Sequence, residues 1–399
     1  MQLTAVGAEM KHDFMRTGLP VAPLLGLFAG RISLPPAILR SLLVVVKFLG
    51  LFRVARYMTR DGLRIICYHG VAVAEEYKYR SRLFVRKELF RRRIEYLRFK
   101  GYPILPLGEA VEALSQGRLP HCATVVTMDD GWEGVYSVAL PIIKKLEVPV
   151  TLYVPTFYIE HPMPVFTVTL SYLFWRTKVR RVELPRGLGT FALDSEAERA
   201  EAVAQELGVS LPPADRLKFL KEMAEALDVS FEDIETQHLF RALDEQQLRQ
   251  LADAGVDIQL HSHRHEWSAD DSRATVEAEI TDNRRFLEKV VSHPLEHFCY
   301  PSGVHGPQQG EWLAALGVKS ATTIEPGLNY PDTSRFALRR LLDGHPVSDI
   351  EFEAEMTGFM EIVRALRERR FVWMLQRRLR SHRERRSRSL QDRNSALNS

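Results

Sequence analysis

The sequence predicts an α/β protein built as an eight-unit β/α barrel or a shortened variant of one. Short apolar runs of strand length alternate with longer amphipathic segments of helix length. The most distinctive polar residues follow such runs, at the strand ends where parallel barrels carry their chemistry. An apolar content of 45% and a charged content of 26% over 399 residues suit a globular protein with one large core.

The first half of the barrel is expected after a helical, amphipathic N-terminal extension, residues 1–60. The first barrel helix shows an apolar stripe of Leu89, Ile94 and Leu97. Gly101 and Pro103 stop it. The expected strands are 63–67, 104–107, 123–128 and 148–154, and the expected helices are 88–101, 107–117 and 139–146.

The alternation lapses between about residues 156 and 243, where we expect a helical insertion that shapes or covers a site. Ser195 and Glu198 are expected to form a capping box at the start of one helix, and a second helix is expected near 213–227. The barrel, residues 61–350, resumes with a helix from Asp244. Its later strands are expected at 256–260, 297–301, 318–324 and 336–342.

The N-terminal extension combines apolar and basic residues. Residues 1–17 lack the basic start and apolar core of a secretory signal, so we expect none. The apolar stretches 19–30 and 38–52 are shorter than the ~20 residues that span a bilayer. The second contains Arg40 and Lys47, and fits either the interface of an anionic membrane or a helix packed on its own barrel.

A basic C-terminal helix and tail is expected over residues 351–399. Its arginines, interrupted by the apolar run 371–375, favour an anionic membrane surface, with a solvated tail as the alternative. Nucleic acid is disfavoured as a partner because no nucleic-acid-binding motif accompanies the arginines. Three cysteines fit no disulfide spacing and indicate buried thiols in a reducing compartment. We therefore expect a cytoplasmic protein, peripheral at the inner face of the cell membrane.

The stretch Asp129-Asp130-Gly131, which follows an apolar strand, is the most informative part of the chain. Adjacent carboxylates resist joint ionisation, and a bound cation removes that cost. His261 and His265, just after another strand, supply further ligands. One Asp and two His give a three-ligand metal site with an open position, typical of a catalytic centre. These ligands suit Zn²⁺, and also Co²⁺, Ni²⁺, Mn²⁺ or Fe²⁺.

Such a centre predicts hydrolysis of an ester or amide. The cation polarises a carbonyl oxygen and lowers the pKa of a bound water. The carboxylate that does not bind the metal is then placed to deprotonate that water. An Asp-Asp-Gly or a His-x-x-x-His alone is more often a surface turn. Their joint occurrence at strand ends carries the prediction.

Residues 127–131 and 261–265 resemble two motifs of the polysaccharide deacetylase family (carbohydrate esterase family 4, with its chitooligosaccharide and peptidoglycan deacetylases). The family motifs are Thr-Phe-Asp-Asp-Gly and His-Ser/Thr-x-x-His. Residues 68–71, Tyr-His-Gly-Val, match a third family pattern, Tyr-His-x-Val. The resemblance covers about residues 63–344 and implies a distorted (β/α) barrel of seven or eight strands with the insertion inside it.

The resemblance also implies residue roles. Asp129 corresponds to the catalytic base, and Asp130, His261 and His265 to the metal ligands. The family's closing Leu-x-His motif, the usual source of the general acid, has no clear counterpart. The candidates for that role are His69 and His345.

A further motif departs from the family. Where the best-known members read Arg-x-Pro-Tyr, this chain has Cys299 followed by Tyr300, Pro301, Ser302 and Gly303. Cys299, which we expect to be a small buried filler, replaces the Arg that braces the catalytic Asp. We expect Arg339 or Arg340 to take that part from another strand.

Four residues in or near this motif are expected at the substrate. The Ser302 backbone N–H is expected to face the developing oxyanion, a role that needs no side chain. Tyr300 and Pro301 are placed with it at the substrate. Trp132 is expected either to stack on a sugar ring or to form a wall of the barrel mouth.

Together these features predict a metal-dependent deacetylase, with Zn²⁺ as the simplest fit, that removes the N-acetyl group of an N-acetylated sugar. The sugar belongs to a polysaccharide, an oligosaccharide or a lipid-linked glycan, and the context would be glycan biosynthesis. Two alternatives stay open: a catalytically impaired saccharide-binding relative, and an O-acetyl esterase or amide hydrolase of the same mechanism.

Overall fold

The computed structural model describes residues 35–367, which divide into two compact units. The barrel unit comprises residues 62–347. The terminal unit comprises the described residues on either side of it, 35–61 and 348–367. The apolar stretch 19–30 and most of the basic tail predicted from the sequence lie outside the described residues.

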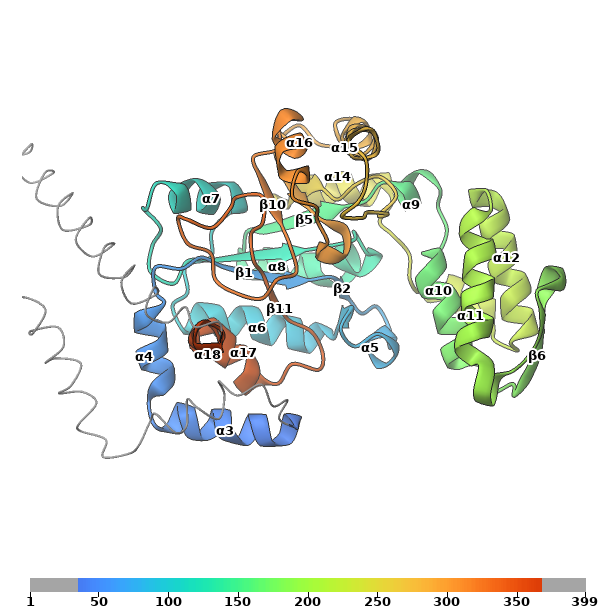
Figure 1. The fold of residues 1–399 in the computed structure, drawn as a ribbon, viewed down its shortest axis with the longest axis horizontal. Helices are drawn as coiled ribbons and strands as arrows, with labels where there is room; N and C mark the ends of the chain where they lie inside the picture. The colour runs from blue at the N-terminus through green and yellow to red at the C-terminus, as the bar shows by residue number, and fades with distance from the viewer. Residues whose placement is uncertain (1–34, 368–399) are drawn as a thin grey trace, which may run out of the picture. The chain divides into compact units, whose positions relative to one another are not determined.

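The barrel unit is built on a seven-stranded parallel sheet in the order β10-β9-β8-β5-β4-β1-β11 (Figure 1). Leu338, just before β11, bridges to Thr322 of β10, while Leu341 pairs with Ile66 of β1. This segment therefore joins both edges of the curled sheet, which confirms the predicted distorted barrel. The strands are β1 Arg64–Tyr68, β4 Thr124–Met128, β5 Val150–Val154, β8 Asp257–Leu260, β9 His297–Cys299, β10 Ser320–Thr322 and β11 Leu341–Leu342.

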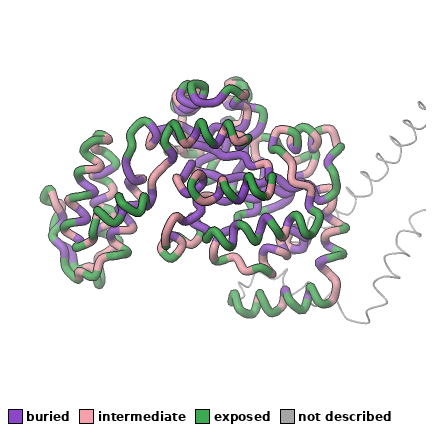
Figure 2. The backbone as a smooth tube through the Cα atoms, turned by 180° about the vertical axis from the view of Figure 1, so that it is seen from behind, coloured by how far each residue is buried: buried purple, intermediate pink, exposed green. Residues whose placement is uncertain are grey.

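The sheet is the core of the barrel unit. Every residue of β1, β4 and β5 is buried, as expected for parallel strands covered on both faces (Figure 2). The predicted strand at 104–107 is reduced to a bridge from Ile104 to Thr124, because Pro103 and Pro106 cannot donate to a ladder. The surrounding helices are α6 Lys87–Phe99, α7 Leu107–Ser115, α8 Leu140–Leu146, α14 Glu245–Asp253, α15 Arg273–Leu287 and α16 Gln309–Ala315.

The apolar core of the insertion continues to Ala72, Phe84 and Trp132 outside it. Gly208 permits close helix packing there, because an added Cβ would come within 1.9 Å of the Phe166 ring. A bridge between Trp132 and Ala242 joins the end of the insertion to the loop after β4. Its elements are α9 Phe157–Glu160, α10 Phe166–Arg176, β6 Arg181–Leu184, β7 Gly189–Ala192, α11 Leu193–Ser210, α12 Pro213–Ala226 and α13 Phe231–Thr236.

The terminal unit brings together segments from both ends of the chain. Its four helices are α3 Pro36–Phe48, α4 Leu51–Met58, α17 Asp349–Met356 and α18 Phe359–Arg367. Leu43 and Val46 of α3 belong to one apolar cluster with Phe52, Phe359 and Val363. Within residues 35–367, no helix combines the length and the apolar character needed to cross a membrane.

Candidate metal centre

The three metal ligands predicted from the sequence converge at the carboxyl end of the sheet. Asp130 follows β4, and His261 and His265 lie in the turn after β8. Asp130 Oδ1 is 3.3 Å from His261 Nε2 and 3.2 Å from His265 Nε2. Two ligands bound ~2.1 Å from one ion at a tetrahedral angle stand ~3.4 Å apart, so these spacings fit a single cation.

The hydrogen bonds of His261 support this fit. Its Nδ1 lies 2.7 Å from the backbone oxygen of Cys299, which can only accept, so Nδ1 carries the proton. Nε2 is then the ring nitrogen that faces the Asp130 carboxylate. An imidazole nitrogen and a carboxylate oxygen at this spacing can both bind one cation. The side chain of His265 is 35% exposed, which leaves the group open to solvent on one side.

The turns that carry the ligands have left-handed backbone. Asp130, Ser262 and His265 have φ angles of 73°, 60° and 60°, and Gly131 follows with 62°. For residues other than glycine this conformation costs roughly 1–2 kcal/mol each. Such strain accumulates where surrounding contacts hold a functional geometry.

Helix α15 supplies those contacts through two buried polar side chains. Asn283 accepts the backbone N–H of His261 at 3.0 Å and donates to the Val154 oxygen at 2.9 Å. Glu279 accepts the N–H groups of His263 and Arg264 at 2.9 and 2.8 Å. These two residues were not assigned to the site from the sequence, although polar residues four positions apart on the buried face of α15 are a signal that could have identified them.

Asp129 is paired with a buried arginine. Its side chain accepts from Arg340 Nη1 at 2.8 Å and Nη2 at 2.7 Å, and the two residues are 2% and 0% exposed. Burial raises the pKa of Asp129, but the charge and hydrogen bonds of Arg340 outweigh it and lower the pKa to about 2. Asp129 is therefore ionised throughout the neutral range.

The brace is Arg340 and not Arg339. Arg339 Nε lies 3.7 Å from Glu325 at the surface, so its predicted place beside Asp129 is wrong. The two residues are adjacent in an extended segment and point to opposite sides, and only Arg340 points inward. Cys299 is fully buried, with its Sγ 3.2 Å from Arg340 Nη2. It leaves room for a guanidinium that enters from another strand.

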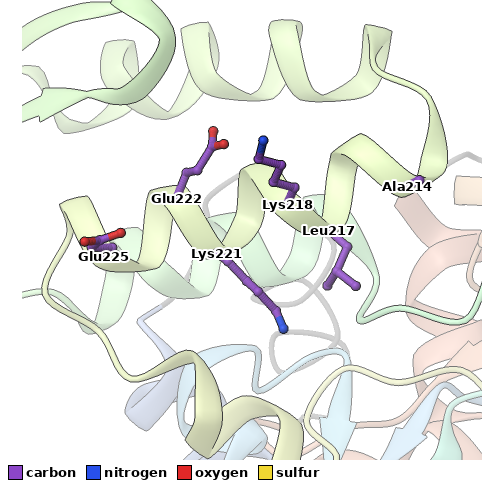
Figure 3. Close-up of a pocket in the computed structure, with 6 residues that line it drawn as sticks. All are labelled: Ala214, Leu217, Lys218, Lys221, Glu222 and Glu225. Atoms are coloured by element: carbon purple, nitrogen blue, oxygen red, sulfur yellow. The ribbon is translucent and has the colours of Figure 1, made fainter.

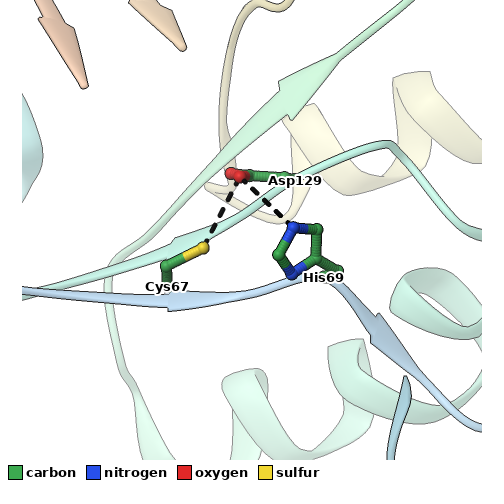
Figure 4. A group of neighbouring side chains, drawn as sticks. All are labelled: Cys67, His69 and Asp129. Carbon is green, nitrogen blue, oxygen red and sulfur yellow. Dashed lines mark hydrogen bonds and ion pairs between the residues drawn. The ribbon is translucent and has the colours of Figure 1, made fainter. Parts of the chain in front are cut away.

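Two further groups of side chains have atoms close enough to hold an ion, and both include Asp129. One contains Cys67 and His69 (Figure 4), and the other contains His261 and Cys299. Both oxygens of Asp129 are already bonded to the cation of Arg340. Burial also raises the pKa of both thiols well above the ordinary value, which disfavours the thiolate form that binds metals. Asp130, His261 and His265 therefore form the group that best suits an ion.

The two candidates for the general acid occupy different surroundings. His69 Nε2 is 3.9 Å from Asp129 Oδ2, and the side chain is 22% exposed (Figure 4). The His345 ring packs against Tyr77 with the ring centres 4.9 Å apart, and its backbone N–H bonds to Ser81. His69 is thus the candidate that adjoins the base.

Trp132 contacts the site from a buried position. Its Nε1 donates to Asp130 Oδ2 at 3.0 Å, and its ring meets the edge of Phe84. At 4% exposure the ring has no free face for a sugar, so the prediction of stacking is wrong and the alternative of a wall is favoured. Its hydrogen bond leaves Oδ1 of Asp130 directed at the two histidines.

The residues expected at the substrate come directly after Cys299 in the chain, and Cys299 contacts the predicted ligand His261. Cys299 bonds to His261 through its carbonyl oxygen, and the next residues are the buried Tyr300 and Pro301 and the exposed Ser302. Ser302 has a φ of 55° in a tight turn, which directs its backbone differently from that of its neighbours. The position of its N–H relative to a substrate stays a prediction.

A shallow groove on the insertion involves none of these residues (Figure 3). Its charged side chains are engaged at the surface, with Glu222 paired to Arg186 at 2.7 Å and Lys221 to Glu235 at 2.9 Å. It is the solvated face of α12. The lining residues are Ala214, Leu217, Lys218, Lys221, Glu222 and Glu225.

The fold is an α/β barrel, and a candidate metal centre with three possible ligands lies at the carboxyl ends of its strands. The model of the polysaccharide deacetylase family matches residues 117–321, just over half of the chain. The chain belongs to this family, as its motifs predicted. No curated protein matches the chain.

Solved structures with similar folds include the Streptococcus pyogenes deacetylase PplD in complex with acetate. It is 20% identical, with a TM-score of 0.50 over 74% of this chain and 98% of that one. IcaB from Ammonifex degensii is 19% identical, with a TM-score of 0.47 over 74% and 97%. BA3943 from Bacillus anthracis, a pseudoenzyme of the same family, is 11% identical, with a TM-score of 0.27 over 61% and 59%.

Replacing the brace tests the Asp129 pair. Arg340→Met is expected to destabilise the fold by about 3–5 kcal/mol, because it leaves a buried carboxylate without its cation. Arg339→Met, the matched control, should cost less than about 1 kcal/mol, because its ion pair is at the surface. Urea titrations give both free energies of unfolding, and equal losses would contradict the assignment.

The same urea titrations, repeated at acid pH, test the pKa of Asp129. The pKa of Asp129 falls from its ordinary 3.8 to about 2 on folding, so the native state holds fewer protons than the unfolded state between these values. The pair thus contributes about 2 kcal/mol above pH 3.8, which is lost as the pH falls toward 2. Arg340→Met should lose this part of the pH dependence.

The α15 contacts are tested by metal affinity. Asn283→Ala is expected to weaken binding of Zn²⁺ by about 10–100-fold, because the turn that carries His261 loses its anchor. Glu277→Ala, on the exposed side of the same helix, should leave affinity unchanged. Calorimetric titration of the metal-free protein measures both. An unaltered affinity in Asn283→Ala would show that the turn with His261 keeps its conformation without the Asn283 hydrogen bond.

Proposed function

We propose that this protein is a metal-dependent N-deacetylase that acts on an N-acetylated sugar of a polysaccharide, oligosaccharide or lipid-linked glycan. The observation that carries the proposal is the division of two adjacent carboxylates: Asp130 faces two histidines, and Asp129 faces Arg340. One carboxylate is thereby committed to a cation site, and the other is kept ionised beside it. Family membership supplies the substrate class.

The residues divide the work of amide hydrolysis. Asp130, His261 and His265 would hold the ion, of which Zn²⁺ suits the donors best. Such an ion polarises the acetamide oxygen and lowers the pKa of a water. Asp129 removes a proton from the attacking water as its oxygen bonds to the carbonyl carbon.

Two further groups complete the reaction. The backbone N–H of Ser302 donates to the oxygen that becomes negative in the tetrahedral intermediate. His69 then gives a proton to the nitrogen as the carbon–nitrogen bond breaks. Acetate leaves and the sugar keeps a free amine.

We further propose that the acceptor is a lipid-linked glycan, met at the cytoplasmic face of the cell membrane during glycan biosynthesis. The support is the combination of a glycan-directed family with apolar and basic residues at both ends of the chain. Extracts of lipid-linked N-acetylated glycans should be deacetylated faster than the same glycans freed from lipid. Equal rates would remove this part of the proposal.

Acetate release is the direct test of the reaction. The purified protein should release acetate from N-acetylated oligosaccharides, lose activity with a chelator and regain it with Zn²⁺. Asp129→Asn should lower kcat by about 10²–10⁴-fold while metal content is retained, because a general base is removed. Asp130→Asn should lose the metal itself.

Paired substrates separate the alternatives. Faster release from O-acetyl than from N-acetyl sugars would favour the esterase. Full metal binding without acetate release from a broad panel would instead favour a saccharide-binding relative, and the deacetylase proposal would fall.

The general acid can be assigned by comparing the two histidines. His69→Gln is expected to lower kcat by about 10²-fold with metal content unchanged, because the leaving nitrogen loses its proton donor. His345→Gln should keep nearly full activity, because its ring packs against Tyr77 and not beside Asp129. A larger loss in His345→Gln would transfer the role to that residue.

A further inference from the structure

Helix α3 of the terminal unit presents an apolar face that no described residue covers. Its largest members are Ile38, Val44, Val45 and Phe48, which are 50%, 55%, 46% and 88% exposed. At 100° per residue, these positions share one sector of the helix, about 120° wide, with Ala37 and Ser41. The sector contains no charged residue.

The opposite side of α3 accounts for the fold of the unit. Leu43 and Val46 are buried in its core. The two cations of the helix lie on its flank, where Arg40 pairs with Glu351 at 3.0 Å and Lys47 with Glu353 at 2.6 Å. Carboxylates of α17 thus engage the charges that made this segment look amphipathic in the sequence. The exposed face is apolar without them.

The concentration of apolar surface here is unusual for the chain. Of twelve large apolar side chains exposed in the described residues, six lie on α3 and α4. The other two of these six are Val54 and Tyr57 of α4, and the Arg60 guanidinium lies 4.3 Å from the centre of the Tyr57 ring. Contiguous exposed apolar surface marks a site of interaction with a protein or a membrane.

The charge of the sequence that follows the terminal unit favours an anionic membrane. Helix α18 belongs to the same unit and leads into residues 368–399, where ten arginines stand against three acidic residues, a net charge of 10 − 3 = +7. Basic segments of this kind are attracted to anionic lipids. A helix of 13 residues is only ~20 Å long, too short to span a bilayer, and suits insertion in the plane of its surface.

We propose that the terminal unit docks on an anionic bilayer by inserting the Phe48 side of α3 among the lipids. This gives the lipid-linked acceptor of the proposed function a route to the enzyme. The docking itself does not depend on deacetylase activity, so the two can fail separately.

Flotation with vesicles tests the proposal in the full-length protein. The probes are vesicles of phosphatidylcholine with and without about one third phosphatidylglycerol. The protein should float with the anionic vesicles, and Phe48→Asp should weaken its partition at least tenfold. Phe99→Asp is the matched control, because Phe99 is 84% exposed on α6 of the barrel unit and should change nothing.

A label reports insertion directly. All three native cysteines are buried, so Phe48→Cys can be labelled selectively with a fluorophore sensitive to polarity. Its emission should shift to the blue with anionic vesicles and be quenched by brominated lipid chains. Activity of Phe48→Asp on a water-soluble substrate should match wild type, which separates loss of docking from loss of catalysis.

Three outcomes would overturn the proposal. One is equal flotation of wild type and Phe48→Asp. Another is a dimer in solution that Phe48→Asp dissociates, with no vesicle binding by either form, which would assign the face to a second copy. The third is vesicle binding that appears only when residues 1–34 are removed, which would show that the N-terminal segment occupies the face.

Discussion

Two neighbouring carboxylates with opposite partners determine the design of this site. Asp129 and Asp130 are consecutive and largely buried, and both must be ionised for the proposed chemistry. Like charges this close would drive one of them to take up a proton. The structure avoids this by turning Asp129 to Arg340 and Asp130 to the two histidines. The left-handed conformation of Asp130 sends the two side chains in these different directions.

Arg340 keeps Asp129 ionised but lowers its basicity. By lowering its pKa to about 2, Arg340 keeps the carboxylate ionised and oriented in a buried site, but makes it a weaker base. Proton transfer from water to such a base is uphill, and it becomes less so when a bound cation lowers the pKa of that water. The proposed ion and the brace are therefore complementary, and neither makes an effective centre alone.

The sequence predicted the parts of this site that depend on local motifs. The motifs around Asp130 and His261 lie at strand ends, and alternation of strands and helices places such ends at one edge of the barrel. The sequence could not distinguish Arg339 from Arg340 as the partner of Asp129, because a shift of one residue reverses the side to which a strand residue points. That register is fixed only by pairing β11 with β1. The assembly of α3 with α17 depends on contacts some 300 residues apart, which no local pattern encodes.

The loss of the family arginine does not by itself indicate a loss of catalysis. Cys299 occupies the motif position, but a guanidinium bonds both oxygens of Asp129 from the strand across the barrel. Replacing a buried ion pair by apolar residues is often neutral or stabilising. A protein that only bound saccharides could replace both Asp129 and Arg340 by well-packed apolar residues at little cost in stability. Its presence beside a complete ligand set therefore favours an enzyme over a binding relative.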